Sequence, residues 1–149
     1  MSTTDLTTIT IVRHVPVGAE QAYTAWVDPR ELAQWWWPQW PDTTYQIDAR
    51  AGGSYRIHSA AVGMGVEGVF TAVDRPNGFT MTWIWISDGE AAAVDGEPVV
   101  DTVEVRFVPS AEGTEVTVQH TSTEHIAGGG GAEQGWNDVL DRLPRHFAA

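Results

Sequence analysis

The chain has 149 residues, no cysteine and eight basic residues that are all arginine, set against 20 acidic residues for a formal net charge of −12. This inventory excludes disulfides, thiolate nucleophiles, cysteine-ligated zinc, Schiff-base lysines and the lysine of a Walker A phosphate loop. The negative charge argues against nucleic acid and anionic membranes as partners, so we expect no nucleic-acid binding and no membrane insertion.

The length predicts a single domain spanning residues 1–149, with residues 1–7 disordered. The N-terminus lacks the basic and apolar regions of a signal peptide, and no run approaches the ~20 apolar residues of a transmembrane helix. Together with the absence of disulfides, this favours a cytoplasmic location. Eight tryptophans are the unusual feature, because they supply large, rigid apolar surfaces suited to cores, pockets or interfaces.

The first part of the chain predicts one strand and two short helices. Apolar residues alternate over residues 8–15, which predicts a strand, and they recur at helical spacing over residues 19–27. Asp28 then offers an N-cap, Pro29 fits the first helical position, and Glu31 would complete a capping box. We therefore expect a second short helix, which the prolines after the tryptophan run terminate.

The rest of the chain predicts a series of strands and a final helix. Alternating apolar residues predict strands over residues 43–50, 54–60, 66–74, 79–86, 102–107 and 116–120. The acidic segment 88–98 is expected to be a loop, and residues 128–131 are expected to be flexible. An amphipathic helix is predicted over residues 132–147, with a kink or an early end at Pro144. Short connections favour an antiparallel sheet with segregated helices, which is an α+β fold.

Several short motifs then follow one another in a specific order. They are Trp26-Val27-Asp28-Pro29, Leu32-Ala33-Gln34-Trp35-Trp36, Arg50-Ala51-Gly52-Gly53-Ser54-Tyr55, Gly68-Val69-Phe70, Phe79, Thr82-Trp83, Thr114-Glu115-Val116-Thr117-Val118, His120 and Gly135-Trp136. Over residues 9–147 they resemble the START-like (SRPBCC) superfamily of polyketide-cyclase-like and birch-pollen-allergen-like proteins, in the branch named for the activator of the heat-shock protein 90 ATPase. The chain departs from that pattern at residues 37–41, where Trp-Pro-Gln-Trp-Pro replaces the usual Gly-Pro and adds aromatic bulk.

The resemblance implies a helix-grip fold, a curved antiparallel sheet of about six or seven strands around a long C-terminal helix, with two short helices after the first strand. It also implies a cavity between sheet and helix, and no cofactor. Members of the superfamily bind lipids, hormones or polyketides; some catalyse cyclisation, some protect producers from toxic natural products, and one branch assists the chaperone. Within it, sequence determines fold far better than function.

The expected ligand site lies on the concave face of the sheet and on the C-terminal helix. Phe79, Met81, Trp83 and Trp85 share one face of the clearest strand, where they would form a stacking wall for a planar ligand or simply pack as core. The residues expected to bind the ligand are Trp36, Tyr55, Phe70, Met81, Trp83, Trp85, Val105, His120, Trp136 and Leu140.

His120 is the candidate for acid–base chemistry. It shares the parity of the inward-facing valines of its strand, so it is expected to point inward, either as a general acid or base or as a hydrogen-bonded structural histidine. His14 and His58 lie on the opposite parity from their apolar neighbours and are expected at the surface. The spacing of His120, Glu124 and His125 matches no standard ligand pattern, so no metal is expected.

The tryptophan run and the charged strand residues also have to be placed. Trp35, Trp36, Trp37 and Trp40 cannot all be buried on one short helix, so some of them are expected at a pocket rim or at a homodimer contact. The charged residues within strands are expected to be solvated. They are Asp48, Arg56 and Glu67.

Three functions are compatible with these expectations. The first is noncatalytic binding of a small hydrophobic or aromatic molecule, lipid-like or polyketide-like, without a cofactor. The second is an enzyme of polyketide cyclase or hydrolase type with His120 as acid or base, and either function could provide self-protection against a toxic natural product. The third is a chaperone-interacting module. Two or more convergent titratable groups in the cavity would favour the enzyme.

Overall fold

The computed structural model describes residues 7–122 and 130–148, apart from residues 89, 92 and 95. Strand β1 (Thr7–Val15) is followed by helices α1 (Ala19–Val27) and α2 (Pro29–Trp35), as the sequence predicted. The expected disorder of residues 1–7 is wrong for Thr7, which already pairs with Ser122 of the sheet; residues 1–6 lie outside the described residues.

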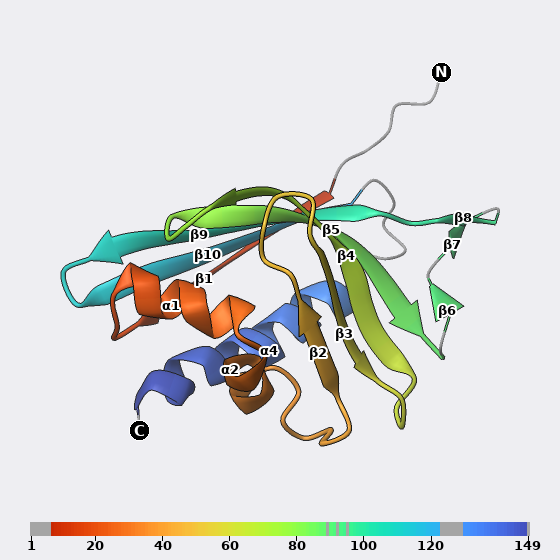
Figure 1. The fold of residues 1–149 in the computed structure, drawn as a ribbon, viewed down its shortest axis with the longest axis horizontal. Coiled ribbons are helices and arrows are strands. Elements are labelled where there is room, and N and C mark those ends of the chain that lie inside the picture. Colours follow the sequence, from red (N-terminus) through yellow and green to blue (C-terminus); the bar gives the residue numbers. More distant parts are fainter. Residues whose placement is uncertain (1–6, 89, 92, 95, 123–129, 149) are drawn as a thin grey trace.

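A large antiparallel sheet dominates the fold (Figure 1). Its longer strands after β1 are β2 (Thr44–Ile47), β3 (Ser54–Ser59), β4 (Met64–Asp74), β5 (Gly78–Ser87), β9 (Asp101–Ser110) and β10 (Gly113–Ser122). They are arranged in the order β1-β10-β9-β5-β4-β3-β2, so the first strand pairs with the last. All other neighbours follow one another along the chain, except β5 and β9, which pair although β6 to β8 lie between them in the sequence. The α+β helix-grip fold expected from the resemblance is confirmed.

The predicted loop at residues 88–98 contains short strands instead. Strand β6 (Glu90–Ala91) pairs with the end of β5, while β7 (Ala93–Val94) and β8 (Glu97–Pro98) pair with each other. Strands of two residues are too short to show alternating apolar residues, so they could not be predicted from the sequence.

Helix α4 (Gly130–Ala148) runs along the side of the sheet that also carries α1 and α2 (Figure 1). The predicted early end at Pro144 is wrong, because the helix continues to Ala148. Its apolar stripe is buried against the sheet, which offsets the backbone hydrogen bond that a proline removes. Gly130 and Gly131, expected to be flexible, belong to the helix, whereas residues 128 and 129 lie outside the described residues.

One half of the interior is mainly aliphatic and fully buried. We call it the β9–β10–α4 core; its side chains are each at most 1% exposed and comprise Val103, Val105, Phe107, Val116, Val118, Leu140 and Leu143. At the surface, the Arg13 guanidinium of β1 donates hydrogen bonds of 2.7 and 2.8 Å to the side chains of Asn137 and Asp141 on α4. These bonds hold the helix across the sheet.

Helix α2 begins as predicted, but its capping box is incomplete. The Asp28 side chain accepts a 2.9 Å hydrogen bond from the Arg30 backbone N–H, and Pro29 occupies the first turn. The Asp28 backbone N–H already donates to Thr24 at the end of α1, so Glu31 has no donor to reach there. Its carboxylate instead lies 3.0 Å from His146 Nε2 and ties α2 to α4.

Candidate functional site

All eight tryptophans of the chain lie in one continuous contact network, with neighbouring ring centroids 4.8 to 6.5 Å apart. We call this network the tryptophan cluster; its members are Trp26, Trp35, Trp36, Trp37, Trp40, Trp83, Trp85 and Trp136. Trp36 is its centre, because it touches five of the other indoles. Trp40 and Trp85 are only partly buried, so the cluster reaches the surface at one end.

As expected, not all four tryptophans of the run are buried, but the exposed remainder is Trp40 alone. Trp35, Trp36 and Trp37 are 0, 2 and 7% exposed, and only Trp40 is partly exposed. The helix ends at Trp35, Trp36 is extended, and Trp37 has a left-handed φ of 56°. The three indoles therefore leave the backbone in different directions, which a continuous helix would not allow.

A small void of about 20 Å³ lies between the helices α1 and α2 and the strands β2 to β5. Its walls are entirely apolar or aromatic and comprise Trp26, Leu32, Trp36, Ile47, Tyr55, Ile57, Phe70, Phe79 and Met81. That volume is enough for about one water molecule, which would need polar partners that these walls scarcely offer. Four of the residues predicted to bind a ligand line this void: Trp36, Tyr55, Phe70 and Met81.

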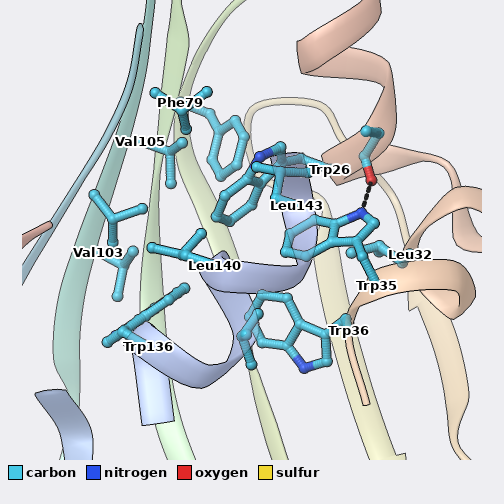
Figure 2. Packing of buried hydrophobic residues seen from close by; sticks show 14 of the residues in the cluster. Trp26, Leu32, Trp35, Trp36, Phe79, Val103, Val105, Trp136, Leu140 and Leu143 are labelled. Carbon is cyan, nitrogen blue, oxygen red and sulfur yellow. Dashed lines mark hydrogen bonds between the residues drawn. The ribbon is translucent and has the colours of Figure 1, made fainter. Parts of the chain in front are cut away.

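Two of the indoles that line the void have an N–H group without an acceptor. Nε1 of Trp26 and Nε1 of Trp36 are buried, in residues that are 4 and 2% exposed, and neither has a hydrogen-bond acceptor among the described residues. Figure 2 shows the contrast with Trp35, whose Nε1 donates a 3.0 Å hydrogen bond to the Ala25 carbonyl. Buried polar groups in native proteins are nearly always paired, so these two donors are exceptional.

The hydroxyl of Tyr55, in contrast, is fully engaged. It donates a 2.6 Å hydrogen bond to the Thr82 carbonyl on β5. Burial raises the pKa of Tyr55 above its ordinary value, with a smaller contribution from Glu67, so the phenol stays neutral. Tyr55 therefore presents its ring, not a charge, to the void.

A second polar feature lies on the concave face beside Trp83. Trp136 Nε1 donates a 2.8 Å hydrogen bond to Nδ1 of His120, and His120 Nε2 lies 2.7 Å from Oδ2 of Asp101. An indole N–H can only donate, so Nδ1 accepts and the neutral ring carries its proton on Nε2. His120 thus donates to Asp101, and all three residues are at most 3% exposed.

This network changes the role expected of His120. The predicted inward orientation is correct, but both ring nitrogens are already bonded, so neither is free to take or give a ligand proton. The oxygen left over is Oδ1 of Asp101, which is buried and has no hydrogen-bond partner in the part of the chain that the structure describes. The sequence interpretation missed Asp101, although its parity with the inward-facing Val103 would have placed it inside.

The other predicted ligand residues lie away from the void. The Trp83 and Trp136 rings are 5.0 Å apart, so these two side chains fill the space expected between them. Trp85 stacks on Trp83 with an interplanar angle of 12°. Val105 and Leu140 belong to the filled β9–β10–α4 core.

The remaining polar predictions have simpler outcomes. His14 is exposed as expected, whereas His58 is half-buried. Arg56 and Glu67 form an ion pair with 45 and 42% of their side chains exposed, and Asp48 pairs with Arg50. These charges are solvated and lie outside the site.

Among residues 7–122 and 130–148, no group of three or more His, Asp or Glu side chains could hold a metal ion. Glu124 and His125 lie outside the described residues. No helix in the described chain is long and apolar enough to cross a membrane.

The fold and this aromatic interior define a START-like helix-grip protein. More specifically, the chain belongs to the family described as activator of Hsp90 ATPase homolog 1-like protein, whose sequence profile matches residues 16–148. No curated protein sequence matches the chain.

Solved structures of other proteins share this fold. MLL2253 from Mesorhizobium loti has a TM-score of 0.77 at 17% identity, covering 94% of this chain and 96% of that one. CalU16 from Micromonospora echinospora has a TM-score of 0.68 at 20% identity, covering 95% and 76%. DynU16, from the dynemicin biosynthetic locus, has a TM-score of 0.74 at 20% identity; 93% of this chain aligns with only 46% of DynU16. At these identities the likeness concerns the fold alone.

Proposed function

We propose that the protein binds a small, mainly apolar aromatic molecule, lipid-like or polyketide-like, between α1–α2 and the strands β2 to β5. The observation that carries this proposal is the void, two of whose lining residues, Trp26 and Trp36, have a buried indole N–H without an acceptor among the described residues. Each unpaired buried donor costs about 1–3 kcal/mol. A bound molecule with a carbonyl or ether oxygen would offset this cost while its ring fills the void.

Binding requires the void to widen, because ligand pockets usually measure about 300–1,000 Å³. We place the opening at Trp36–Trp40, the segment after α2. Trp37 holds a left-handed φ of 56°, a conformation that costs a bulky residue roughly 1–3 kcal/mol. Side chains from elsewhere hold this segment closed: Tyr45 donates to the Trp36 carbonyl, and Arg142 donates to the Trp35 carbonyl at 2.8 Å.

The other functions receive less support from the geometry, because His120 and Asp101 are two convergent titratable groups but neither of them lines the void. An enzyme that used His120 as acid or base would first have to break its bond to Asp101 or to Trp136. A chaperone-interacting role is suggested by the family description alone. Self-protection against a natural product is a variant of the binding function, and the place of DynU16 in a biosynthetic locus motivates including such products among the ligands.

The proposal is tested by calorimetric titration with toluene and acetophenone, two single-ring probes of which only the second carries an acceptor oxygen. We expect saturable binding of both, with acetophenone the tighter. Ile57→Phe puts a larger side chain on the wall of the void, so it should weaken binding by about tenfold or more. Val69→Phe makes the same kind of change at a position 40% exposed on β4 and serves as the control.

Absence of saturable heat with both probes would contradict the proposal. So would equal effects of the two substitutions, because binding would then take place elsewhere. Thermal unfolding of each variant establishes that it is folded before it is titrated.

A further inference from the structure

We infer that α2 is a lid over the void and that the Glu31–His146 pair is its pH-dependent latch, which slows the entry of a ligand when His146 is charged. The inference rests on the proposed function and adds how access to that site is regulated. It is carried by the position of α2 on the wall of the void and by two contacts of different chemistry that hold α2 against α4.

Helix α2 forms part of the wall of the void. Leu32 of the helix and Trp36, which caps its end, both line that space. The helix packs against α1, α4 and β2 (Figure 1), and the single extended residue Asp28 separates it from α1. Hinges are usually a few residues of this kind at the ends of elements. A ligand is therefore admitted when α2 swings about Asp28 and takes Trp36 with it.

Two contacts between α2 and α4 oppose this movement. Arg142 Nε donates a 2.8 Å hydrogen bond to the Trp35 carbonyl at the end of α2. His146 Nε2 lies 3.0 Å from Oε1 of Glu31 near its beginning. The two residues on each helix are four positions apart, so they lie one turn apart on the same face. The two helices are joined at two neighbouring points, and both contacts must separate before α2 can leave α4.

Only one of these contacts changes with pH. An arginine keeps its charge and a backbone carbonyl does not titrate. Histidine side chains, in contrast, lose their charge between about pH 5 and 8, where carboxylates stay ionised. A charged His146 makes a charge-assisted hydrogen bond to Glu31, and a neutral one makes a bond about half as strong. The latch is therefore strongest in the lower part of this interval and weakens as the pH rises.

The charged groups around His146 leave this dependence intact. Glu31 is its one ion-pair partner in the described chain. Tyr45 on β2 stays neutral, because burial raises its pKa to about 12. Arginines and carboxylates on this part of α4, around α2 and on β1 keep their charge over the interval. They are Asp141, Arg142, Arg145, Asp28, Arg30 and Arg13.

Stopped-flow tryptophan fluorescence with acetophenone, which does not titrate, measures the latch directly. Because the pair is 18 and 32% exposed, we expect association to be about two- to fivefold slower at about pH 6 than at about pH 8. His146→Gln and Glu31→Gln each keep a polar side chain and should each abolish this difference. His14→Gln is the matched control, because His14 is exposed and also faces a glutamate, Glu115, at 3.7 Å. It should keep the difference.

Amide hydrogen exchange of α2 provides a readout without ligand. At about pH 6 the wild-type helix should be about two- to fivefold better protected than that of His146→Gln, and at about pH 8 the two should agree. Comparing the two proteins at the same pH cancels the intrinsic pH dependence of exchange.

The outcomes separate this inference from the proposed function. If acetophenone binds but associates equally fast at both pH values, the latch is wrong and the proposed function stands. Equal protection of α2 in the two proteins at the lower pH would likewise contradict the latch, as would loss of the pH dependence in His14→Gln. If acetophenone binds at neither pH, the proposed function is wrong and the regulation inferred from it fails as well.

Discussion

The two halves of the interior are built in different ways. In the β9–β10–α4 core, valines, leucines and one phenylalanine are at most 1% exposed. The tryptophan cluster, in contrast, includes two unpaired indole N–H groups beside a void, and it borders the unpaired oxygen of Asp101. Buried polar groups without partners are features that proteins concentrate at functional sites and compensate elsewhere. This difference supports our proposal that the binding site lies in the aromatic half, while the aliphatic half stabilises the fold.

The largest effect should come from truncating the filled half. Leu140 is 0% exposed, so Leu140→Ala should destabilise the protein by about 2–5 kcal/mol in urea unfolding followed by circular dichroism. Ile57→Val on the wall of the void removes a single methylene and should cost only about 0.5–1.5 kcal/mol. A loss well below 1 kcal/mol for Leu140→Ala would show that the aliphatic half is not the stabilising core.

A matched pair of substitutions tests the unpaired indoles. Trp35→Phe leaves the buried Ala25 carbonyl without its donor, whereas Trp36→Phe removes an N–H that had no acceptor. Both lose comparable apolar area, so Trp35→Phe should be the more destabilising by about 1–3 kcal/mol. Equal losses in chemical denaturation would mean that Trp36 is bonded in solution and that the contrast between the indoles is wrong.

A smaller effect is expected at Asp101 in the ligand-free protein. Asp101→Asn keeps an oxygen that accepts from His120 and removes a buried charge that no cation among the described residues compensates. The free energy of unfolding should therefore stay unchanged or rise by about 1 kcal/mol. If Asp101 had a purely structural role, the same substitution would lower the free energy of unfolding by roughly 1–3 kcal/mol. Thermal and urea unfolding both resolve this difference.

The smallest effect concerns pH. Burial raises the pKa of Tyr45 to about 12 from its ordinary value of 10. Because the folded-state pKa is the higher one, this stabilisation is complete below pH 10 and is lost as the pH rises from 10 through 12. Tyr45→Phe loses the bond to the Trp36 carbonyl, yet its stability should fall less steeply over that interval. Parallel slopes in urea unfolding across the interval would contradict this assignment.

Much of the fold could be predicted because strong local signals agreed with it. Asp28 followed by Pro29 marked the start of α2, and alternating apolar residues marked the longer strands and the inward face of Phe79, Met81 and Trp83. The exceptions were places where local rules are overridden. Pro144 did not end α4, because the buried stripe on both sides of it holds the helix against the sheet.

Less of the site could be predicted, since it depends on features that leave no pattern in the sequence. The positive φ of Trp37 directs the tryptophans of the run inward along different paths, and no residue preference announces it for a bulky side chain. The parity of β10 was enough to place His120 inside. The bonds that fix its tautomer come from β9 and α4, far away along the chain, so only the tertiary structure shows them.

The central claim is that a small aromatic molecule occupies the void lined by Trp26 and Trp36. Indole N–H signals in a nitrogen-correlated NMR spectrum test this claim most directly. Titration with acetophenone should move the Trp26 and Trp36 signals together and to saturation, because each donor gains an acceptor or a ring neighbour. The Trp35 signal, already bonded to Ala25, should stay in place. The account is contradicted if no signal saturates, or if the shifts are confined to the partly exposed Trp40 and Trp85.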